Sequence, residues 1–219
     1  KRERLAAGLR ARGADAALLS APDSIAWLLN LRGADHPYLP VVYAFALLHA
    51  DASMDLYVDP RKVPAELRAS LGHGVRIHAY DAIVAALRAP SDAVLEFDAD
   101  STSQSLLVAA ESGGPRVRFA PDPCVLPRAL KNAREIAGAR AAHRRDGAAC
   151  CRFWNWWEDS LRGGPVRESE LVAKIDSLRA EDPAFRGCSF ATIPGLGPHA
   201  ALPHYRHTAA SDRASRPDD

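Results

Sequence analysis

Hydrophobic and polar positions in residues 1–128 follow two periods, one typical of helices and one typical of strands. The segment RERLAAGLRARG has apolar residues at helical spacing, and the apolar run in ADAALLSA predicts a buried strand after it. VVYAFALLHADASMDLYVDP predicts a β-hairpin, because two apolar runs flank the turn residues Asp51, Ala52 and Ser53. Predicted helices and strands then alternate as far as RVRFAP. The expected fold is an α/β domain with a mixed sheet.

One short helix in this region is predicted from its end signals. SIAWLLNLRG predicts a short, mainly apolar helix, with Ser24 as the expected N-cap and Gly33 as the expected C-terminal stop.

The pattern changes after about residue 128. Apolar or small residues at spacings of three and four predict one long helix from Ile136 to Leu161, stopped by a Gly-Gly-Pro sequence. Trp154 and Trp157 fall on the predicted buried stripe of this helix, and Trp156 falls off it. A second helix is predicted through Leu171, Ile175 and Leu178, and GCSFATI and AALPHYR after it predict a second hairpin. Residues 129–219 are therefore expected to form an incomplete α+β unit.

Composition narrows the class of protein without naming a chemistry. The 219 residues are 47% hydrophobic and 25% charged with a net charge of +1, which is ordinary for a globular protein. The sequence has no block of Lys and Arg of the kind that would indicate a nucleic-acid partner. It also has no apolar run that is long enough to span a membrane. The start of the chain lacks the pattern of a signal peptide, and the four cysteines have no zinc-binding spacing. We expect a cytoplasmic protein with reduced thiols.

Two candidate sites have simpler explanations. Asp98 and Asp100 follow a predicted strand, where catalytic carboxylates often lie, but the next residues are Ser and Thr. Capping of the following helix is the favoured interpretation. The sequence GLGPHA formally matches the glycine motif of dinucleotide-binding proteins, but Pro198 and a predicted strand follow where a helix would be needed. Nucleotide binding is rejected.

Three histidines lie close together near the C-terminus: His199, His204 and His207. Residues three apart on a strand face opposite sides, so His204 and His207 are not expected to bind one metal ion together. Considered by itself, His204 is more typical of a surface or half-buried histidine than of a catalyst.

Three segments together give the chain a resemblance to a known family. SIAWLLNLRGADHPYLPVVYAF resembles the second creatinase-like domain of three-domain Xaa-Pro aminopeptidases, also called aminopeptidase P. KNAREIAGARAAHRRDGAACCRFWNWWE resembles the linker and first helix of their catalytic "pita-bread" domain. FRGCSFATIPGLGPHAALPHYR resembles the first hairpin of that domain, with His204 and Tyr205 matching the His-Tyr pair of the family.

The resemblance implies a fold and an activity. The fold is a creatinase-like α/β domain at residues 1–128, followed at 129–219 by the beginning of a pita-bread domain that ends before the metal ligands. The family removes the N-terminal residue from peptides with proline in second position and uses two divalent metal ions, commonly manganese. By the same resemblance, His204 hydrogen-bonds the substrate or the tetrahedral intermediate. No metal ligand is expected in this chain, which by itself is expected to be inactive.

The sequence departs from the family at three positions. Ala191 stands where Asp is usual, which removes a carboxylate near the pocket; His199 replaces a common Asn and Arg167 a usual Thr. Besides a part of an Xaa-Pro aminopeptidase, two alternatives stay open. One is a non-catalytic dimerisation or interaction module derived from the family, and the other is an enzyme of the prolidase or creatinase type. A homodimer or other self-association is expected, as is a peptide substrate for the complete enzyme.

Overall fold

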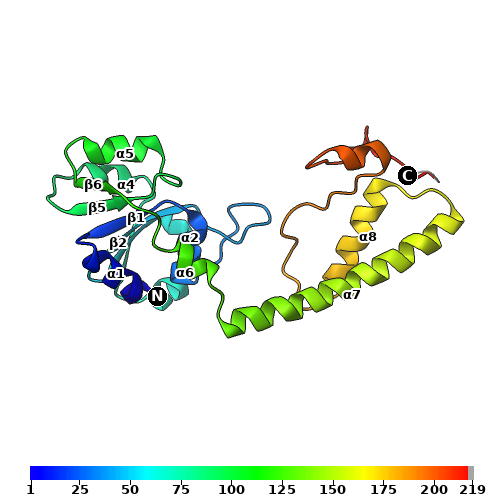
Figure 1. Ribbon diagram of the computed structural model, residues 1–219, viewed down its shortest axis with the longest axis horizontal. Coiled ribbons are helices and arrows are strands. Elements are labelled where there is room, and N and C mark those ends of the chain that lie inside the picture. Colours follow the sequence, from blue (N-terminus) through cyan, green and yellow to red (C-terminus); the bar gives the residue numbers. More distant parts are fainter. Residues whose placement is uncertain (217–219) are drawn as a thin grey trace. The chain divides into compact units, whose positions relative to one another are not determined.

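The computed structural model describes residues 1–216, which form two compact units (Figure 1). The first unit is Lys1–Lys131, and the second begins at Asn132. Each unit is built around its own buried residues and is described by itself.

The first unit contains a six-stranded sheet in the order β4-β3-β2-β1-β5-β6. Strands β1 and β2 pair antiparallel, as do β2 and β3, whereas the pairs β1–β5, β3–β4 and β5–β6 are parallel. The mixed sheet predicted from the sequence is therefore confirmed. The strands are β1 Ala16–Leu19, β2 Ala44–His49, β3 Met54–Val58, β4 Val75–His78, β5 Val94–Phe97 and β6 Arg116–Phe119.

Helices cover both faces of this sheet (Figure 1). On β3, Met54, Leu56 and Val58 face the core shared with the first three helices, and Tyr57 faces the core shared with α4 and α5, because successive strand residues point to opposite sides. The hydrophobic alternation therefore sets which face of the sheet each helix covers. The helices of this unit are α1 Arg2–Ala11, α2 Pro22–Leu29, η1 Pro60–Lys62, α3 Ala65–Leu71, α4 Ala82–Arg88, α5 Gln104–Glu111 and α6 Val125–Ala129.

The predicted hairpin at β2 and β3 is confirmed, but the predicted ends of α2 are wrong. Pro22 is the first residue of α2, and Ser24 lies inside the helix, fully buried, rather than at its N-cap. A proline at the first helical position has the backbone angle that a helix needs and lacks an N–H that would be unpaired there. The helix ends at Asn30, which takes a left-handed conformation with φ of 56°, three residues before Gly33.

A carboxylate on β3 links three strands of the sheet. Asp55 accepts hydrogen bonds from Arg76 at 2.7 Å on each oxygen, from His49 Nε2 at 2.6 Å and from His78 Nε2 at 2.7 Å. Its residue surface is only 9% exposed. Burial by itself would raise the pKa of Asp55, but the hydrogen bonds from Arg76 and the two histidines hold the pKa well below its usual value.

The second unit is dominated by two helices. α7 runs from Ala133 to Gly163 and begins with a reciprocal cap, in which Asn132 and Glu135 bind one another's backbone N–H at 2.9 and 2.8 Å. α8 runs from Glu168 to Ala180 and buries Leu171, Ile175 and Leu178 against α7, as predicted.

The Trp cluster of α7 has a different orientation from the predicted one. Trp154 is 61% exposed, whereas Phe153, Trp156 and Trp157 pack on the small core that includes Val166. Residues 153, 156 and 157 have the spacing of one helix face, and α7 packs on a single helix, so only a narrow face is covered. The prediction that Trp154 is buried and Trp156 is off the packed face is therefore wrong.

The second predicted hairpin is also wrong. Residues 187–193 and 200–206 contain no strand, and η2 Gly197–Ala201 is a short 3₁₀ helix between them. Pro194, Pro198 and Pro203 provide no N–H groups for a strand ladder, and a two-stranded ribbon is marginal by itself. Residues 187–215 instead contact α8 and the residues that open it, and we call them the wrapped segment.

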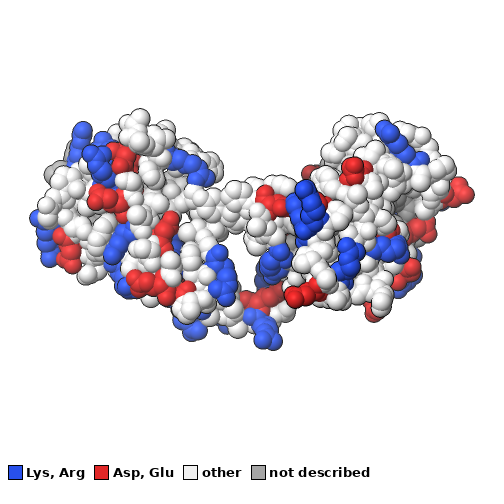
Figure 2. All heavy atoms as spheres, turned by 180° about the vertical axis from the view of Figure 1, so that it is seen from behind, with Lys and Arg blue, Asp and Glu red and all other residues white. Residues whose placement is uncertain are grey.

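Charged side chains of both signs are interspersed over the visible face of each unit (Figure 2). In the part of the chain that the structure describes, no helix combines the length and the apolar character needed to cross a bilayer.

Candidate functional site

A buried carboxylate organises the C-terminal part of the second unit. Glu168, the first residue of α8, is 0% exposed and accepts four hydrogen bonds. On Oε1 the donors are Leu196 N at 3.0 Å and His199 Nδ1 at 2.8 Å. On Oε2 they are Tyr205 OH at 2.8 Å and Arg213 N at 3.3 Å. One side chain thus joins three separate stretches of the wrapped segment to the start of a helix.

The position of Glu168 suits an ionised group. The first turn of a helix has unpaired N–H groups and favours negative charge. Burial by itself would raise the pKa of Glu168, but the hydrogen bonds from Leu196, Tyr205 and His199 outweigh it and hold the pKa below its ordinary value. The carboxylate is therefore charged at neutral pH, although it is buried.

A second set of contacts closes the wrapped segment. Asp212 accepts hydrogen bonds from Ser169 N at 3.0 Å and from Ser169 Oγ at 2.8 Å. Val166 N donates to Ser215 Oγ, and Ser215 N donates to the Val166 carbonyl, both at 2.9 Å. Residues 211–215 are thereby attached to the residues that open α8.

His204 and Tyr205 are neighbours in the chain but differ in burial and in contacts. Tyr205 is half-buried: its hydroxyl donates to Glu168, and its ring stacks on His199 with 4.4 Å between ring centroids. His204 is exposed and has a left-handed backbone with φ of 59°. His204, the residue that the sequence singled out, therefore lies at the surface, next in the chain to a half-buried tyrosine.

The three C-terminal histidines are not brought together as a metal site. His199 is directed to Glu168, and no strand carries these residues, so the strand argument from the sequence does not apply. Within residues 1–216, no three His, Cys, Asp or Glu side chains are grouped so that they could hold a metal ion. The described residues do not fit a two-metal centre.

Sequence reasoning missed Glu168. It lies in the first turn of a predicted helix together with Glu170, and acidic residues there are normally solvent-exposed. Glu168 is buried because the wrapped segment covers it, and the path of that segment was predicted wrongly. No local signal in the sequence separates Glu168 from Glu170.

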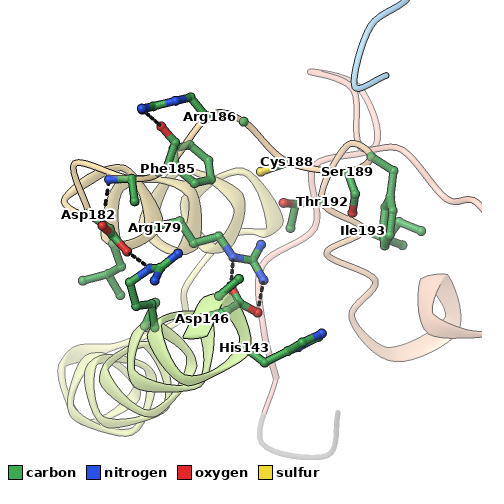
Figure 3. Close-up of a pocket in the computed structure, with 17 residues that line it drawn as sticks. His143, Asp146, Arg179, Asp182, Phe185, Arg186, Cys188, Ser189, Thr192 and Ile193 are labelled. Atoms are coloured by element: carbon green, nitrogen blue, oxygen red, sulfur yellow. Dashed lines mark hydrogen bonds and ion pairs between the residues drawn. The ribbon is translucent and has the colours of Figure 1, made fainter. Parts of the chain in front are cut away.

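A groove of about 580 Å³ lies between α7, the end of α8 and the loop that follows α8 (Figure 3). On its floor Arg179 Nε donates to Asp146 at 2.7 Å, and Arg145 pairs with Asp182. The apolar part of its lining includes Phe190 and Ile193, which are 61% and 44% exposed. A carboxylate neutralises each of these two arginines, so the groove offers a mixed apolar and polar lining.

One thiol lies in the same groove. Cys188 Sγ is 3.5 Å from Asp176, which also accepts a hydrogen bond from Thr192 at 2.9 Å. Burial and the neighbouring carboxylate raise the pKa of Cys188. The thiol is therefore protonated at neutral pH and is not an activated nucleophile.

Comparison with known proteins defines the class. The family model described as "Creatinase/Prolidase N-terminal domain" matches residues 1–135, and the model described as "Metallopeptidase family M24" matches residues 137–219. The chain belongs to the creatinase/prolidase N-terminal domain family, with the M24 metallopeptidase match directly after it.

Two curated relatives are named as probable Xaa-Pro aminopeptidases P. Probable Xaa-Pro aminopeptidase P of Aspergillus clavatus is 36% identical over 199 residues, covering 86% of this chain and 30% of that protein. Its counterpart in Laccaria bicolor is 37% identical over 204 residues, covering 90% and 31%. The chain thus spans just under a third of the length of these curated relatives. The resemblance to Xaa-Pro aminopeptidases predicted from the sequence is confirmed.

Solved structures agree with this assignment. The crystal structure of X-prolyl aminopeptidase from Caenorhabditis elegans, described as a cytosolic enzyme with a di-nuclear active site, matches with a TM-score of 0.87 and 27% identity. The match covers 98% of this chain and 36% of that one. The Xaa-Pro dipeptidase from Bacillus anthracis matches with a TM-score of 0.59 and 18% identity, which supports the fold alone.

Proposed function

We propose that the chain is part of an Xaa-Pro aminopeptidase, which hydrolyses the bond between an N-terminal residue and a proline that follows it. In this proposal, residues 1–128 are the creatinase-like domain and residues 129–219 the first part of the pita-bread domain. The observation that carries the proposal is the likeness to the C. elegans enzyme, which extends over 98% of the chain and therefore through both units. The curated relatives support the same activity.

His204 is the residue proposed to meet the substrate. Its side chain is exposed, and a neutral imidazole can both donate and accept a hydrogen bond. A hydrogen bond from this ring to the substrate carbonyl, or to the oxyanion that forms when that carbonyl is attacked, would stabilise the charge that develops there. The position fits this role, because His204 is exposed while its neighbour Tyr205 is held by Glu168.

The complete enzyme is proposed to use two divalent metal ions, with manganese as the preferred metal. The C. elegans relative is described as having a di-nuclear active site, and the second family model is that of a metallopeptidase. Residues other than those described would have to provide the ligands. We therefore expect no hydrolysis by the 219-residue chain alone.

The chain is also proposed to self-associate. Its proposed location is the cytosol. Four large apolar side chains of the second unit support self-association, because each is more than 40% exposed: Trp154 at 61%, Phe190 at 61%, Leu202 at 52% and Ile193 at 44%. Exposed apolar groups on this scale favour association with another surface.

The function is tested with the complete reading frame that contains these residues. The protein is loaded with manganese, and initial rates are compared on Ala-Pro-Phe and Ala-Ala-Phe. The proposal expects cleavage after Ala in the proline peptide and at least a hundredfold lower kcat/KM on the other peptide. Equal rates on both peptides, or no cleavage of the proline peptide, would contradict it.

A further inference from the structure

We infer that Glu168 is the positioning residue for His204: it holds the hydroxyl of Tyr205 and thereby fixes the direction in which the neighbouring histidine faces. This inference rests on the proposed function for the meaning of His204. The geometry that supports it is independent of that function.

The backbone of His204 has an unusual conformation. Its φ of 59° lies in the left-handed region, which residues with a side chain rarely adopt. Such a conformation persists only where the surrounding structure holds it. The His204 side chain is exposed, so we expect the restraint to come from its neighbours in the chain.

The neighbour that provides this restraint is Tyr205. The Tyr205 hydroxyl donates to Glu168 Oε2 at 2.8 Å and lies 3.2 Å from Ser211 Oγ. The ring stacks on His199, and its backbone N–H binds the Leu202 carbonyl at 3.2 Å. Tyr205 is thus fixed at its ring, its hydroxyl and its backbone, so the peptide that joins it to His204 has little freedom.

The group that binds the Tyr205 hydroxyl has to be a carboxylate. All four groups around Glu168 are donors, two on each oxygen. A glutamine at this position would keep the shape but would place an NH₂ group against two of the donors. Because the site is fully buried, water cannot replace the lost acceptor. The charge-assisted bonds to a carboxylate are also the stronger ones.

Glu168 differs in this respect from the other acidic residue of the same helical turn. Glu170 makes the ordinary capping contact, in which its carboxylate accepts from Arg167 N at 2.7 Å. This contact lies within the residues that open α8. Of these two residues, only Glu168 therefore contacts Tyr205 and can act on His204.

The test uses the full 219-residue chain, uniformly labelled with ¹⁵N and ¹³C, and three variants. Glu168→Gln removes the charge, and Tyr205→Phe removes only the hydroxyl that transmits it. Glu181→Gln is the matched control, because Glu181 follows the far end of α8, is 54% exposed at its side chain and pairs with Arg152. The readouts are the backbone shifts and φ-dependent coupling of His204, its imidazole shifts, and the titration of the Tyr205 phenol.

We expect Glu168→Gln and Tyr205→Phe both to remove the left-handed signature of His204 and to move its imidazole signals, whereas Glu181→Gln leaves them unchanged. Burial, together with the hydrogen bond and charge of Glu168, raises the pKa of Tyr205, so this pKa should fall in Glu168→Gln. The amide signals of Leu171 and Ile175 report whether α8 is intact. If Glu168→Gln fails to fold, Tyr205→Phe decides the question.

Unchanged His204 signals in Tyr205→Phe would overturn the inference. So would a fall in the Tyr205 pKa without any change at His204, because the restraint would then end at the tyrosine. None of these readouts uses a peptide. Failure of the peptidase assay would therefore overturn the proposed function, but it would not change the conclusion that these readouts give about Glu168 and His204.

Discussion

Replacing Asp55 with Asn tests whether the polar cluster of the sheet stabilises the first unit. The variant keeps the shape of the side chain and one acceptor oxygen but loses the charge. Asp55 makes four contacts of 2.6–2.7 Å, two with Arg76 and one each with His49 and His78. The partners are 52%, 30% and 39% exposed at their side chains, so solvent screens these contacts substantially.

The expected magnitude follows from this exposure. An ion pair or charged hydrogen bond with an exposed partner contributes roughly 0.5 kcal/mol, so four contacts sum to about 2 kcal/mol. We therefore expect Asp55→Asn to lower the free energy of unfolding by about 2 kcal/mol at pH 7. Asp92→Asn is the control, because Asp92 is exposed; its effect should be under about 0.5 kcal/mol.

The pH dependence has a definite sign. The pKa of Asp55 is lower in the folded chain than in the unfolded chain, where a carboxyl titrates near 3.9. Its stabilisation is therefore fully present above about pH 5 and declines as the pH falls through 4 towards the folded pKa. At pH 3 the difference between wild type and Asp55→Asn should be smaller by about 1 kcal/mol than at pH 7.

The assay is urea unfolding of the full chain, followed by the amide signals of β3 at pH 7 and pH 3. Observing β3 restricts the measurement to the first unit. A variant that matches wild type within about 0.5 kcal/mol at pH 7, or a difference that does not shrink at pH 3, would refute the reasoning.

Further results are expected from three experiments: a pair of glycine variants, a core variant and light scattering. Gly114→Ala should prevent normal folding of the first unit, because a Cβ there would lie 1.9 Å from the Leu87 carbonyl oxygen. Gly138→Ala, in open space on α7, should be neutral or stabilising by up to about 1 kcal/mol, and equal thermal midpoints for the two variants would contradict this. Phe97→Ala, at a fully buried position, should cost about 3–5 kcal/mol in the same unfolding assay; a loss below about 1 kcal/mol would show that the core is placed wrongly. Light scattering should show a mass that rises with concentration, and less so for Phe190→Ser; a monomer at every concentration would refute self-association.

The sequence was sufficient for the sheet of the first unit because its signals are local and agree with one another. In β2 and β3 the apolar alternation, the turn residues and the strand lengths all predict the same hairpin. The apolar stripe of α8 was equally clear, because Leu171, Ile175 and Leu178 occupy one helical face.

The sequence was insufficient where tertiary contacts decide the path of the chain. Residues 187–206 have the apolar pattern of strands, yet without a strand partner they wrap around α8. The buried state of Glu168 depends on that wrapping, so no local pattern indicated it. Similarly, the exposure of Trp154 depends on how many helices cover α7, which periodicity does not reveal.

The central claim is that His204 belongs to the substrate pocket of an Xaa-Pro aminopeptidase. The most direct measurement is kcat/KM of the complete reading frame on Ala-Pro-Phe, for wild type, His204→Ala and the matched control His73→Ala, since His73 is an exposed histidine of the first unit. The account predicts a loss of roughly a hundredfold for His204→Ala, as for removal of an oxyanion donor, and no loss for His73→Ala. Wild-type kcat/KM in a correctly folded His204→Ala enzyme would contradict it.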